Sequence, residues 1–378
     1  MLRLAAFYFA YFCHLGAFVA YFSLWLEARG HSPAEIAAVL AAAQFVRIVA
    51  PGAWGWVADV WSARIPGGRR GLVALSSLCA ALCLALLLLA ESLQAVFAVV
   101  ALTALFTSGI LPLVEATTLG VLGARIERYG PVRVWGSVGF IVSVLAVGSL
   151  LDRQPVAVLV PIIAAWMLLA ALSALALPRA HVAPAERGAP GLQRVLREPR
   201  VAALFAACFC MSVANGPLYV FYSIYLVDAG YSKTVVGLLW TLGVLAEIVL
   251  FLALPILFRR YSLRALLLAS FVAAAVRFVA IGWGVGSLAL LAAAQLLHAL
   301  TFGAYHSAAV AAVHRLFTGA LAVRGQALYA SLSYGLGGAA GMLLAGWSWS
   351  ALGSAATFGL SGAFGVAGAL LVAWKVRL

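Results

Sequence analysis

The sequence predicts an all-α membrane protein with twelve transmembrane helices in two pseudo-symmetric six-helix bundles. Three observations predict this fold: the chain is 66% hydrophobic and only 9% charged, it contains twelve apolar segments of spanning length, and its halves share a sequence pattern. A soluble protein of 378 residues with a mean hydropathy of +1.10 could not cover its surface with polar groups. A bilayer can solvate such a surface.

Each apolar segment approaches the roughly 20 residues that a helix needs to cross the hydrocarbon. Inside a bilayer every backbone polar group must be paired within its own element, so we expect helices. The first segment continues to Trp25, too long for the apolar region of a signal peptide, and we expect it to be retained as a span. The predicted spans are 4–28, 33–58, 71–90, 93–121, 133–151, 156–177, 201–228, 233–257, 265–284, 288–315, 326–349 and 354–375.

The loop between the sixth and seventh predicted spans divides the chain. It runs from Pro178 to Arg200 and also contains Pro184 and Pro190. We therefore expect an N-terminal six-helix bundle over residues 1–177, a cytoplasmic linker over 178–200 and a C-terminal six-helix bundle over 201–378. Within the linker, the segment 192–197 is predicted to form a short amphipathic helix.

Basic residues lie almost entirely on one predicted side of the membrane. Of the 24 Lys and Arg, 19 fall on that side, Arg29, Arg153 and Lys233 fall on the other, and Arg47 and Arg277 lie within spans. Because cytoplasmic loops are enriched in Lys and Arg, both termini are predicted to face the cytoplasm, from a cytoplasmic (inner) membrane. The net charge of +13 then needs no nucleic-acid partner. The 19 residues are Arg3, Arg64, Arg69, Arg70, Arg125, Arg128, Arg133, Arg179, Arg187, Arg194, Arg197, Arg200, Arg259, Arg260, Arg264, Arg315, Arg324, Lys375 and Arg377.

The two halves share a pattern at an offset of 200 residues. Residues 21–26 (Tyr-Phe-Ser-Leu-Trp-Leu) align with 221–226 (Phe-Tyr-Ser-Ile-Tyr-Leu), and Gly-His-Ser at 30–32 aligns with Gly-Tyr-Ser at 230–232. The same offset aligns Arg47 in the second span with Glu247 in the eighth. Internal repeats of this kind are typical of transporter folds. Opposite charges at equivalent positions make a pair between the halves geometrically feasible.

On these residues the chain resembles the major facilitator superfamily, and within it the phenylpropionate permease group, over nearly its whole length. The segment from Gly55 to Asp59 is similar to the superfamily's signature loop, with Val60 where an arginine is usual. The resemblance implies proton-coupled uptake and a gating role for Asp59. The other stretches that carry it are Gly230-Tyr-Ser through Leu239-Trp240 to Glu247, Leu257-Phe-Arg-Arg, Val276-Arg277, Tyr129-Gly-Pro-Val-Arg133-Val-Trp135-Gly136-Ser137 and His298 to His306.

Four Arg and Glu side chains lie well inside predicted spans, away from their ends, where each costs roughly a few kcal/mol and needs a reason. For Arg47 and Glu247 we expect either a charge pair near the substrate path, with Glu247 carrying the proton, or a static pair between the halves. Arg277 either binds substrate or extends its long side chain to the membrane surface. Glu115 is either a second proton-coupling site or the partner of a cytoplasmic basic residue.

Polar and aromatic side chains form faces on the first, seventh and tenth predicted helices. On the tenth, His298 aligns with Tyr305, and His306 lies about 80° around the helix. A lone histidine is usually a packing residue, but these three helices line the cavity in the fold that the chain resembles. Aromatic walls suit a flat organic solute, and arginines suit its carboxylate. The substrate-binding candidates are Arg47, Arg277, His14, Tyr21, Asn215, Tyr219, Tyr222, His298, Tyr305 and His306.

The sequence contains no catalytic or metal-binding pattern. It has no phosphate-binding Gly-Lys-Ser/Thr loop, no serine elbow and no His-Glu-x-x-His, and none of its five cysteines has zinc-ligand spacing. We therefore expect no enzyme activity, no cofactor and no metal site.

The expected function is secondary active transport by a monomer in the membrane. The substrate would be a small organic anion, with an aromatic carboxylate as the favoured example, moved with protons into the cytoplasm. A sugar or nucleoside substrate, an efflux direction and a non-transporting membrane receptor remain alternatives. The expected partners are the solute, protons and membrane lipid.

Overall fold

The computed structural model describes residues 1–61, 64–123, 125, 128–178 and 192–376. Twelve helical segments among these residues are long and apolar enough to cross a membrane, one for each predicted span, and the part described contains helices but no strand. The predicted fold class is therefore confirmed. Most of the predicted linker, residues 179–191, lies outside the described residues. The predicted short helix beside it is present as α7 (Leu192–Leu196).

The chain divides into two compact units, which are described separately. Unit 1 comprises Met1–Ala185 and Ser232–Leu238, and unit 2 comprises Glu186–Tyr231 and Leu239–Leu378. The first two turns of the eighth span thus belong to unit 1, while the rest of that helix belongs to unit 2.

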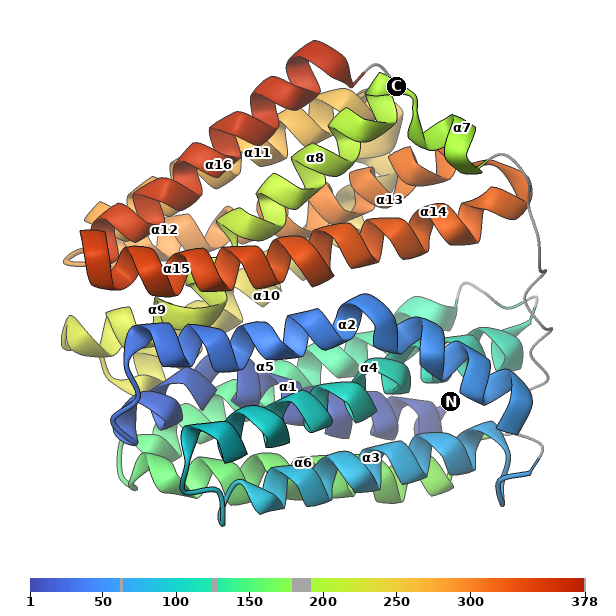
Figure 1. The fold of residues 1–378 in the computed structure, drawn as a ribbon, viewed down its shortest axis with the longest axis vertical. Coiled ribbons are helices and arrows are strands. Elements are labelled where there is room, and N and C mark those ends of the chain that lie inside the picture. Colours follow the sequence, from blue (N-terminus) through green and yellow to red (C-terminus); the bar gives the residue numbers. More distant parts are fainter. Residues whose placement is uncertain (62–63, 124, 126–127, 179–191, 377–378) are drawn as a thin grey trace. The chain divides into compact units, whose positions relative to one another are not determined.

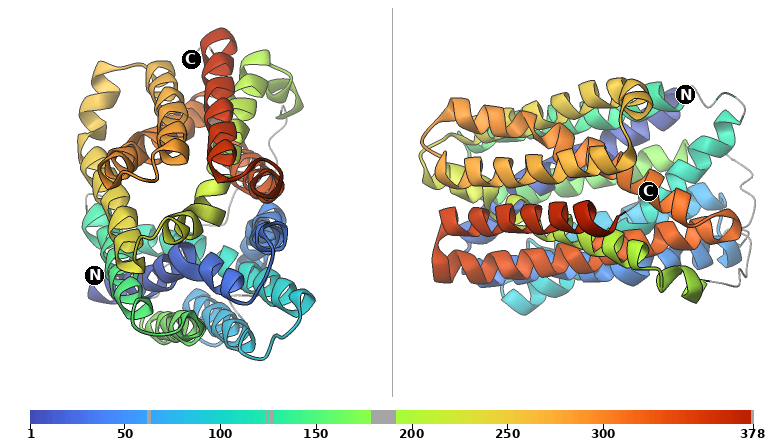
Figure 2. Two further views of the ribbon diagram at one scale, coloured as in Figure 1. Left: turned by 90° about the vertical axis from the view of Figure 1, so that its left-hand side faces the viewer. Right: turned by 90° about the horizontal axis from the view of Figure 1, so that it is seen from above.

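Unit 1 is built around α1, which packs against α5 and α6 along most of its length. Both α2 and α3 pack on α4, and α3 also packs on α6 (Figures 1 and 2). Ser92 caps the N-terminus of α4 by accepting a hydrogen bond from the backbone N–H of Ala95. The elements are α1 (Leu2–Ala28), α2 (Pro33–Trp61), α3 (Arg69–Leu86), α4 (Leu93–Leu122), α5 (Tyr129–Leu151), the 3-10 turn η2 (Val156–Val158) and α6 (Leu159–Leu175).

In unit 2, three of the spans are interrupted helices. The seventh span breaks at Asn215, and the tenth and eleventh contain π-helical segments, whose turns are wider than those of an α-helix. The closest packing joins α11 and α8 to α16, and α9 to α15. The elements after α7 are α8 (Pro199–Ala214), α9 (Gly216–Asp228), α10 (Lys233–Arg260), α11 (Leu263–Trp283), α12 (Leu288–Leu296), η3 (Ala299–Ala304), α13 (Tyr305–Leu316), η4 (Gly319–Leu321), α14 (Ala322–Tyr329), η5 (Ala330–Gly337), α15 (Gly338–Leu352) and α16 (Ser354–Lys375).

The sequence repeat corresponds to a repeated turn. Gly30 and Gly230 follow the first helix of each half with φ values of 81° and 90°, a conformation that favours glycine. In each turn the next residue, His31 or Tyr231, donates its backbone N–H to the carbonyl of the residue five positions earlier. The two halves therefore end their first span in the same way.

Glycine also permits close packing at equivalent positions of the two halves. A Cβ on Gly16 of α1 would lie 2.8 Å from the carbonyl oxygen of Phe140 in α5. A Cβ on Gly216 of α9 would lie 2.3 Å from the carbonyl carbon of Gly341 in α15. In each half the first span thus meets the fifth backbone to backbone, as small residues allow between membrane helices.

Replacing Gly216 with valine is expected to destabilise the protein strongly. The added side chain would meet backbone atoms of α15 that cannot rotate away, so the cost should reach or exceed the upper end of the about 1–3 kcal/mol typical of overpacking. Melting temperatures of the purified protein in detergent test this. Gly52→Ala is the control, because nothing lies within 4 Å of a Cβ at Gly52. A melting temperature for Gly216→Val equal to that of the control would contradict the packing.

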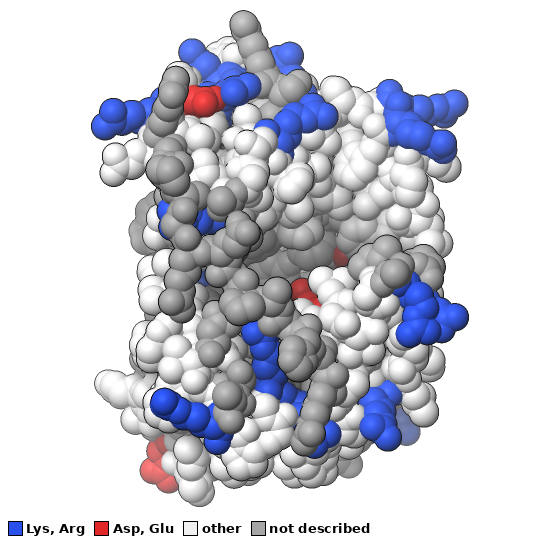
Figure 3. Space-filling model, turned by 90° about the vertical axis from the view of Figure 1, so that its right-hand side faces the viewer, with Lys and Arg blue, Asp and Glu red and all other residues white. Residues whose placement is uncertain are grey.

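In each unit, Lys and Arg side chains lie at the ends of helices. They include Arg69 at the start of α3, Arg260 at the end of α10 and Arg315 near the end of α13. Blue Lys and Arg side chains are prominent on the face that Figure 3 shows. These are the helix ends that the distribution of Lys and Arg predicts to be cytoplasmic.

At the other end of unit 1, Asp152 caps the N-terminus of α10. Its carboxylate accepts hydrogen bonds from the backbone N–H groups of Lys233 (2.7 Å) and Thr234 (3.0 Å), and from the Thr234 hydroxyl. Burial by itself raises the pKa of Asp152, but these hydrogen bonds outweigh it and the net pKa lies below the usual 3.8. The Tyr21 hydroxyl donates to the carbonyls of Val144 (2.8 Å) and Lys233 (3.1 Å) and so fixes the same junction.

Asp152→Ala is expected to lower the melting temperature in a pH-dependent way. A cap of this kind is worth about 1 kcal/mol, and less here because the carboxylate is largely exposed. Since the folded-state pKa is lowered, the contribution is fully present above the usual pKa of 3.8 and is lost as the pH falls through the lower folded value. Melting curves between pH 7 and pH 3 should show a difference from wild type that is constant at first and becomes smaller at the acid end. A difference that already disappears by pH 6 would contradict this.

Candidate functional site

The centre of the candidate site is Arg277 on α11 in unit 2. Its side chain is fully buried, with 0% exposure. Nη1 donates a hydrogen bond to the hydroxyl of Thr301 (2.9 Å), and Nη2 donates to Oε1 of Gln295 (3.1 Å). Both partners are neutral, and no ion pair to Arg277 is found among the described residues. The membrane-surface interpretation of Arg277 is therefore wrong, because the side chain is enclosed.

An enclosed guanidinium without a carboxylate partner is costly. A charge in the membrane interior costs about 2.5–3.5 kcal/mol on insertion scales, and each unmade hydrogen bond of a buried group costs about 1–3 kcal/mol more. The Nε of Arg277 has no hydrogen-bond partner in the described part of the chain. A functional requirement would explain why such a residue is retained here.

Further buried polar atoms around Arg277 lack partners. These are Nε2 of Gln295, Nδ1 of His298 and the hydroxyl of Tyr222, none of which has a hydrogen-bond partner among the described residues. The exposed fractions of these side chains are 2%, 8% and 0%. The Tyr222 hydroxyl lies near both Gln295 and Arg277. Helices α9, α11 and α12 thus direct unpaired polar groups into one region of unit 2.

Glu247 on α10 pairs with His298. The distance from Oε2 of Glu247 to Nε2 of His298 is 3.6 Å, and the carboxylate side chain keeps 17% exposure. Gly303 in η3 lies against the same helix, and a Cβ there would lie 2.9 Å from Cδ2 of Leu250 in α10. The pair thus places a partly exposed carboxylate beside an enclosed imidazole.

The π-helical segment η3 changes which residues share a face of the tenth span. The rings of His298, Phe302 and His306 stack in sequence, with centroid distances of 5.4 and 6.2 Å and interplanar angles of 12° and 16°. A π-helix turns less per residue than an α-helix, so His306 rotates into line with His298. Tyr305 instead donates its hydroxyl to the carbonyl of Cys208 (3.3 Å). The α-helical prediction that Tyr305 aligns with His298 is therefore wrong.

His306 joins a polar group that the sequence analysis missed. Its Nδ1 lies 2.8 Å from the hydroxyl of Tyr334 and 3.3 Å from that of Tyr329, and the two hydroxyls are 3.2 Å apart. Both tyrosines belong to the eleventh span, at and within η5. The sequence carries no signal for this cluster, because tyrosine is common in spans and the partners are brought together by packing. The same holds for Gln295 and Thr301 beside Arg277.

In unit 1, Glu115 pairs with a basic residue. Its Oε1 lies 3.7 Å from Nε of Arg133 on α5. The guanidinium of Arg133 also lies over the rings of Phe12 (4.3 Å) and Tyr8 (5.3 Å). This arrangement supports the alternative in which Glu115 is the partner of a basic residue.

Two candidates from α1 of unit 1 are held by backbone groups. His14 is buried, and its Nδ1 lies 3.1 Å from the carbonyl of Ile163 in α6. Tyr21 is the residue that joins α5 to the start of α10. Both side chains thus have structural partners, and a role in substrate binding stays a prediction for each.

The remaining candidates lie on α2 and at the break in the seventh span. Arg47 is exposed and donates to Oε1 of Gln44 (3.4 Å). Arg47 belongs to unit 1 and Glu247 to unit 2, and their pairing stays a prediction. The side chain of Asp59 lies outside the described residues. Asn215 donates to the carbonyl of Met211 (2.8 Å), and the Tyr219 ring stacks on Trp240 with a centroid distance of 6.3 Å.

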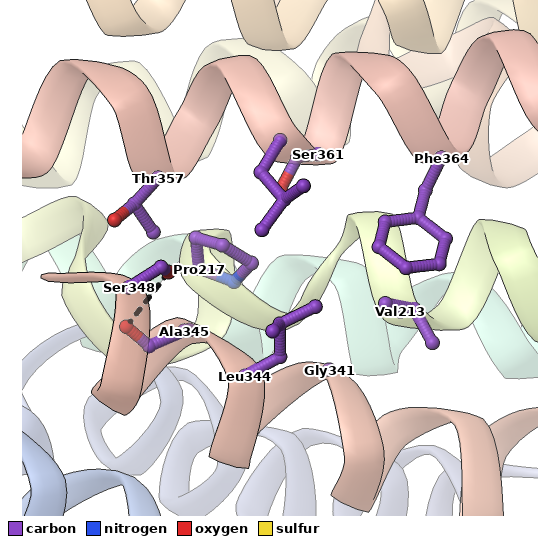
Figure 4. A pocket seen from close by; sticks show the side chains of 10 residues that line it. Val213, Pro217, Gly341, Leu344, Ala345, Ser348, Thr357, Ser361 and Phe364 are labelled. Atoms are coloured by element: carbon purple, nitrogen blue, oxygen red, sulfur yellow. Dashed lines mark hydrogen bonds between the residues drawn. The ribbon is translucent and has the colours of Figure 1, made fainter. Parts of the chain in front are cut away.

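A hollow of about 170 Å³, partly open to the outside, lies elsewhere in unit 2 between the α8–α9 break, α15 and α16. Figure 4 shows its lining, in which Val213, Pro217, Leu344 and Phe364 present apolar surface and Ser348 bonds to the carbonyl of Ala345. It contains no charged side chain and does not include the Arg277 region. In the described part of the chain, no three His, Cys, Asp or Glu side chains gather as a metal ion would require.

Twelve spanning helices that enclose an arginine and a carboxylate–histidine pair define a polytopic membrane transporter. The chain belongs to the MFS_1 like family, whose model matches residues 1–360, and it is a transporter of the major facilitator superfamily. The predicted resemblance to that superfamily and its phenylpropionate permease group is confirmed.

Several known proteins resemble the chain. It is 32% identical over 359 residues to the probable 3-phenylpropionic acid transporter of Escherichia coli (strain K12), covering 93% of this chain and 91% of that protein. It is 29% identical to the maltose permease of Geobacillus stearothermophilus, over 71% and 68% of the two chains. The crystal structure of the nucleoside transporter NupG superposes with a TM-score of 0.85 at 18% identity, covering 100% of this chain and 99% of that chain. At that identity the likeness shows the fold alone.

Proposed function

We propose that this transporter is a proton-coupled symporter that moves a small organic carboxylate into the cytoplasm. The observation that carries the proposal is the fully buried Arg277, whose side chain is bonded only to neutral groups among the described residues. A substrate carboxylate would supply the missing negative charge. An arginine is well suited to this task, because its planar guanidinium matches a carboxylate.

The position of the Glu247–His298 pair supports proton coupling. Arg277 lies near His298, and two positive charges close together in a low-dielectric interior repel one another. A bound carboxylate compensates Arg277 and weakens this repulsion. Substrate binding then favours protonation of the pair, and by linkage protonation favours substrate binding to the same extent. The neutralised, loaded protein would then alternate its access between the two sides of the membrane.

The aromatic character of the region supports an aromatic carboxylate as the preferred substrate. The stacked rings of His298, Phe302 and His306 offer flat surfaces beside the charged groups. The relative with 32% identity is a probable 3-phenylpropionic acid transporter, and 3-phenylpropionic acid is an aromatic carboxylate. We also propose the inner membrane as the location, with both termini in the cytoplasm, from the distribution of Lys and Arg.

Proton movement in proteoliposomes tests the proposal. Purified wild-type protein is reconstituted, and external alkalinisation is recorded after addition of aromatic carboxylates, aliphatic carboxylates, sugars or nucleosides. We expect aromatic carboxylates to drive alkalinisation and the neutral solutes to give none. A response to sugars or nucleosides alone would show that the substrate is a neutral solute and not a carboxylate. If no solute causes proton movement, the proposed symport mechanism is wrong.

A further inference from the structure

The chemistry of Arg277 determines how Gln295 is oriented. A guanidinium can only donate hydrogen bonds, so the Gln295 oxygen must face Nη2 of Arg277, as the 3.1 Å contact requires. The NH₂ group of Gln295 therefore points elsewhere, and it has no partner among the described residues. The Nε–H of Arg277 and the Tyr222 hydroxyl also lack partners there. The Gln295 amide and the Tyr222 hydroxyl lie beside each other without a hydrogen bond of normal geometry, so three enclosed donors remain beside one positive charge.

From this geometry we infer that Arg277, Gln295 and Tyr222 form the receptor for the carboxylate of the solute, and that Gln295 is the residue that makes it select an anion. The inference rests on the proposed function and names the groups that carry it out. A carboxylate offers two acceptor oxygens and a negative charge, so it can satisfy the donors and compensate the guanidinium together. A neutral hydroxyl accepts a hydrogen bond but leaves the charge of Arg277 uncompensated.

Gln295 decides the selectivity because it holds Arg277 through a neutral oxygen. A glutamate at the same position would hold Nη2 equally well and would supply the negative charge from the protein itself. The receptor would then have no need of an anionic solute. Glutamine and glutamate have nearly the same shape, but glutamine at position 295 leaves an anion receptor, whereas glutamate would form an ion pair with Arg277.

A solute reaches these enclosed groups only when the surrounding helices move. The π-helix η3 adjoins the receptor and contains Thr301, the second partner of Arg277. π-helical segments are frequent at functional sites.

The test compares Gln295→Glu with Gln326→Glu. In the solute-free protein in detergent, Gln295→Glu is expected to raise the melting temperature by about 3 °C or more, because a buried charge gains a counter-charge. In proteoliposomes the same variant is expected to lower carboxylate uptake at least tenfold, because the built-in carboxylate occupies the donors. Gln326→Glu adds the same charge where the glutamine amide donates to the carbonyl of Val310 (2.9 Å), and it should lower the melting temperature.

The outcomes separate this inference from the proposed function. If wild type takes up no carboxylate, the proposed function fails, and a raised melting temperature of Gln295→Glu would still show that Arg277 lacks compensation. If wild type takes up carboxylates and Gln295→Glu does so equally well, the receptor assignment fails alone. Should Gln295→Glu not fold, Gln295→Asn withdraws the amide by one methylene without adding charge. It is expected to raise the KM for carboxylate at least tenfold with little change in kcat, and an unchanged KM would overturn the inference.

Discussion

Arg277→Met is expected to reduce carboxylate uptake at least 100-fold. The guanidinium supplies the positive charge and charge-assisted hydrogen bonds for the substrate carboxylate, each worth about 1.5–3 kcal/mol. A hundredfold loss corresponds to about 2.7 kcal/mol, so one or two of these bonds account for it. Methionine is long, flexible and apolar, and it can occupy the buried volume without introducing a new polar group.

Stability distinguishes a binding role of Arg277 from a structural one. A receptor arginine without a counter-charge destabilises the solute-free protein, so Arg277→Met should melt at or above the wild-type temperature. An arginine retained for packing would give the opposite result. Uptake of labelled carboxylate measures the effect on transport, and melting temperatures of the same preparations measure the effect on stability. Uptake within threefold of wild type, or a large drop in melting temperature, would contradict the assignment.

Glu247→Gln is expected to abolish solute-driven proton uptake while preserving exchange of carboxylate across the membrane. Glutamine keeps the shape and the hydrogen bonding towards His298 but cannot take up a proton. The solute can then still bind at Arg277 and cross when it is present on both sides. It is no longer accumulated by a proton gradient, because net transport needs the proton to be carried and released.

Two assays on the same proteoliposomes check this separation. External pH after solute addition reports coupled transport, and exchange of labelled for unlabelled carboxylate reports binding and crossing. Glu198→Gln is the matched control, because Glu198 forms an exposed pair with Arg200 (2.7 Å) outside the site. Glu115→Gln tests the other acidic candidate, and a loss of coupling there rather than at Glu247 would move the proton site to the Arg133 pair.

In the interrupted helices, α-helical periodicity does not predict which side chains share a face. An α-helical count of about 100° per residue placed Tyr305 on the face of His298. The π-helix η3 instead brings His306 onto that face, and Tyr305 bonds to the carbonyl of Cys208. The local sequence does not predict a π-helical turn, because the extra residue of such a turn is stabilised by contacts with neighbouring helices. Threonine and tyrosine are common enough in spans that Thr301, Tyr329 and Tyr334 do not stand out, and nothing in the sequence links Gln295 to Arg277.

The sequence by itself determined the twelve helices, because a bilayer leaves an apolar chain no other way to pair its backbone. It also determined the repeated turns at Gly30 and Gly230 and the unusual positions of Arg277 and Glu247, since charges and glycines stand out in apolar segments. Only the tertiary structure decided the partners, which are Gln295 and Thr301 for Arg277, His298 for Glu247 and Arg133 for Glu115. The physical reason is that membrane spanning is a property of each segment, whereas a side-chain partner depends on how separate helices rotate and pack against one another.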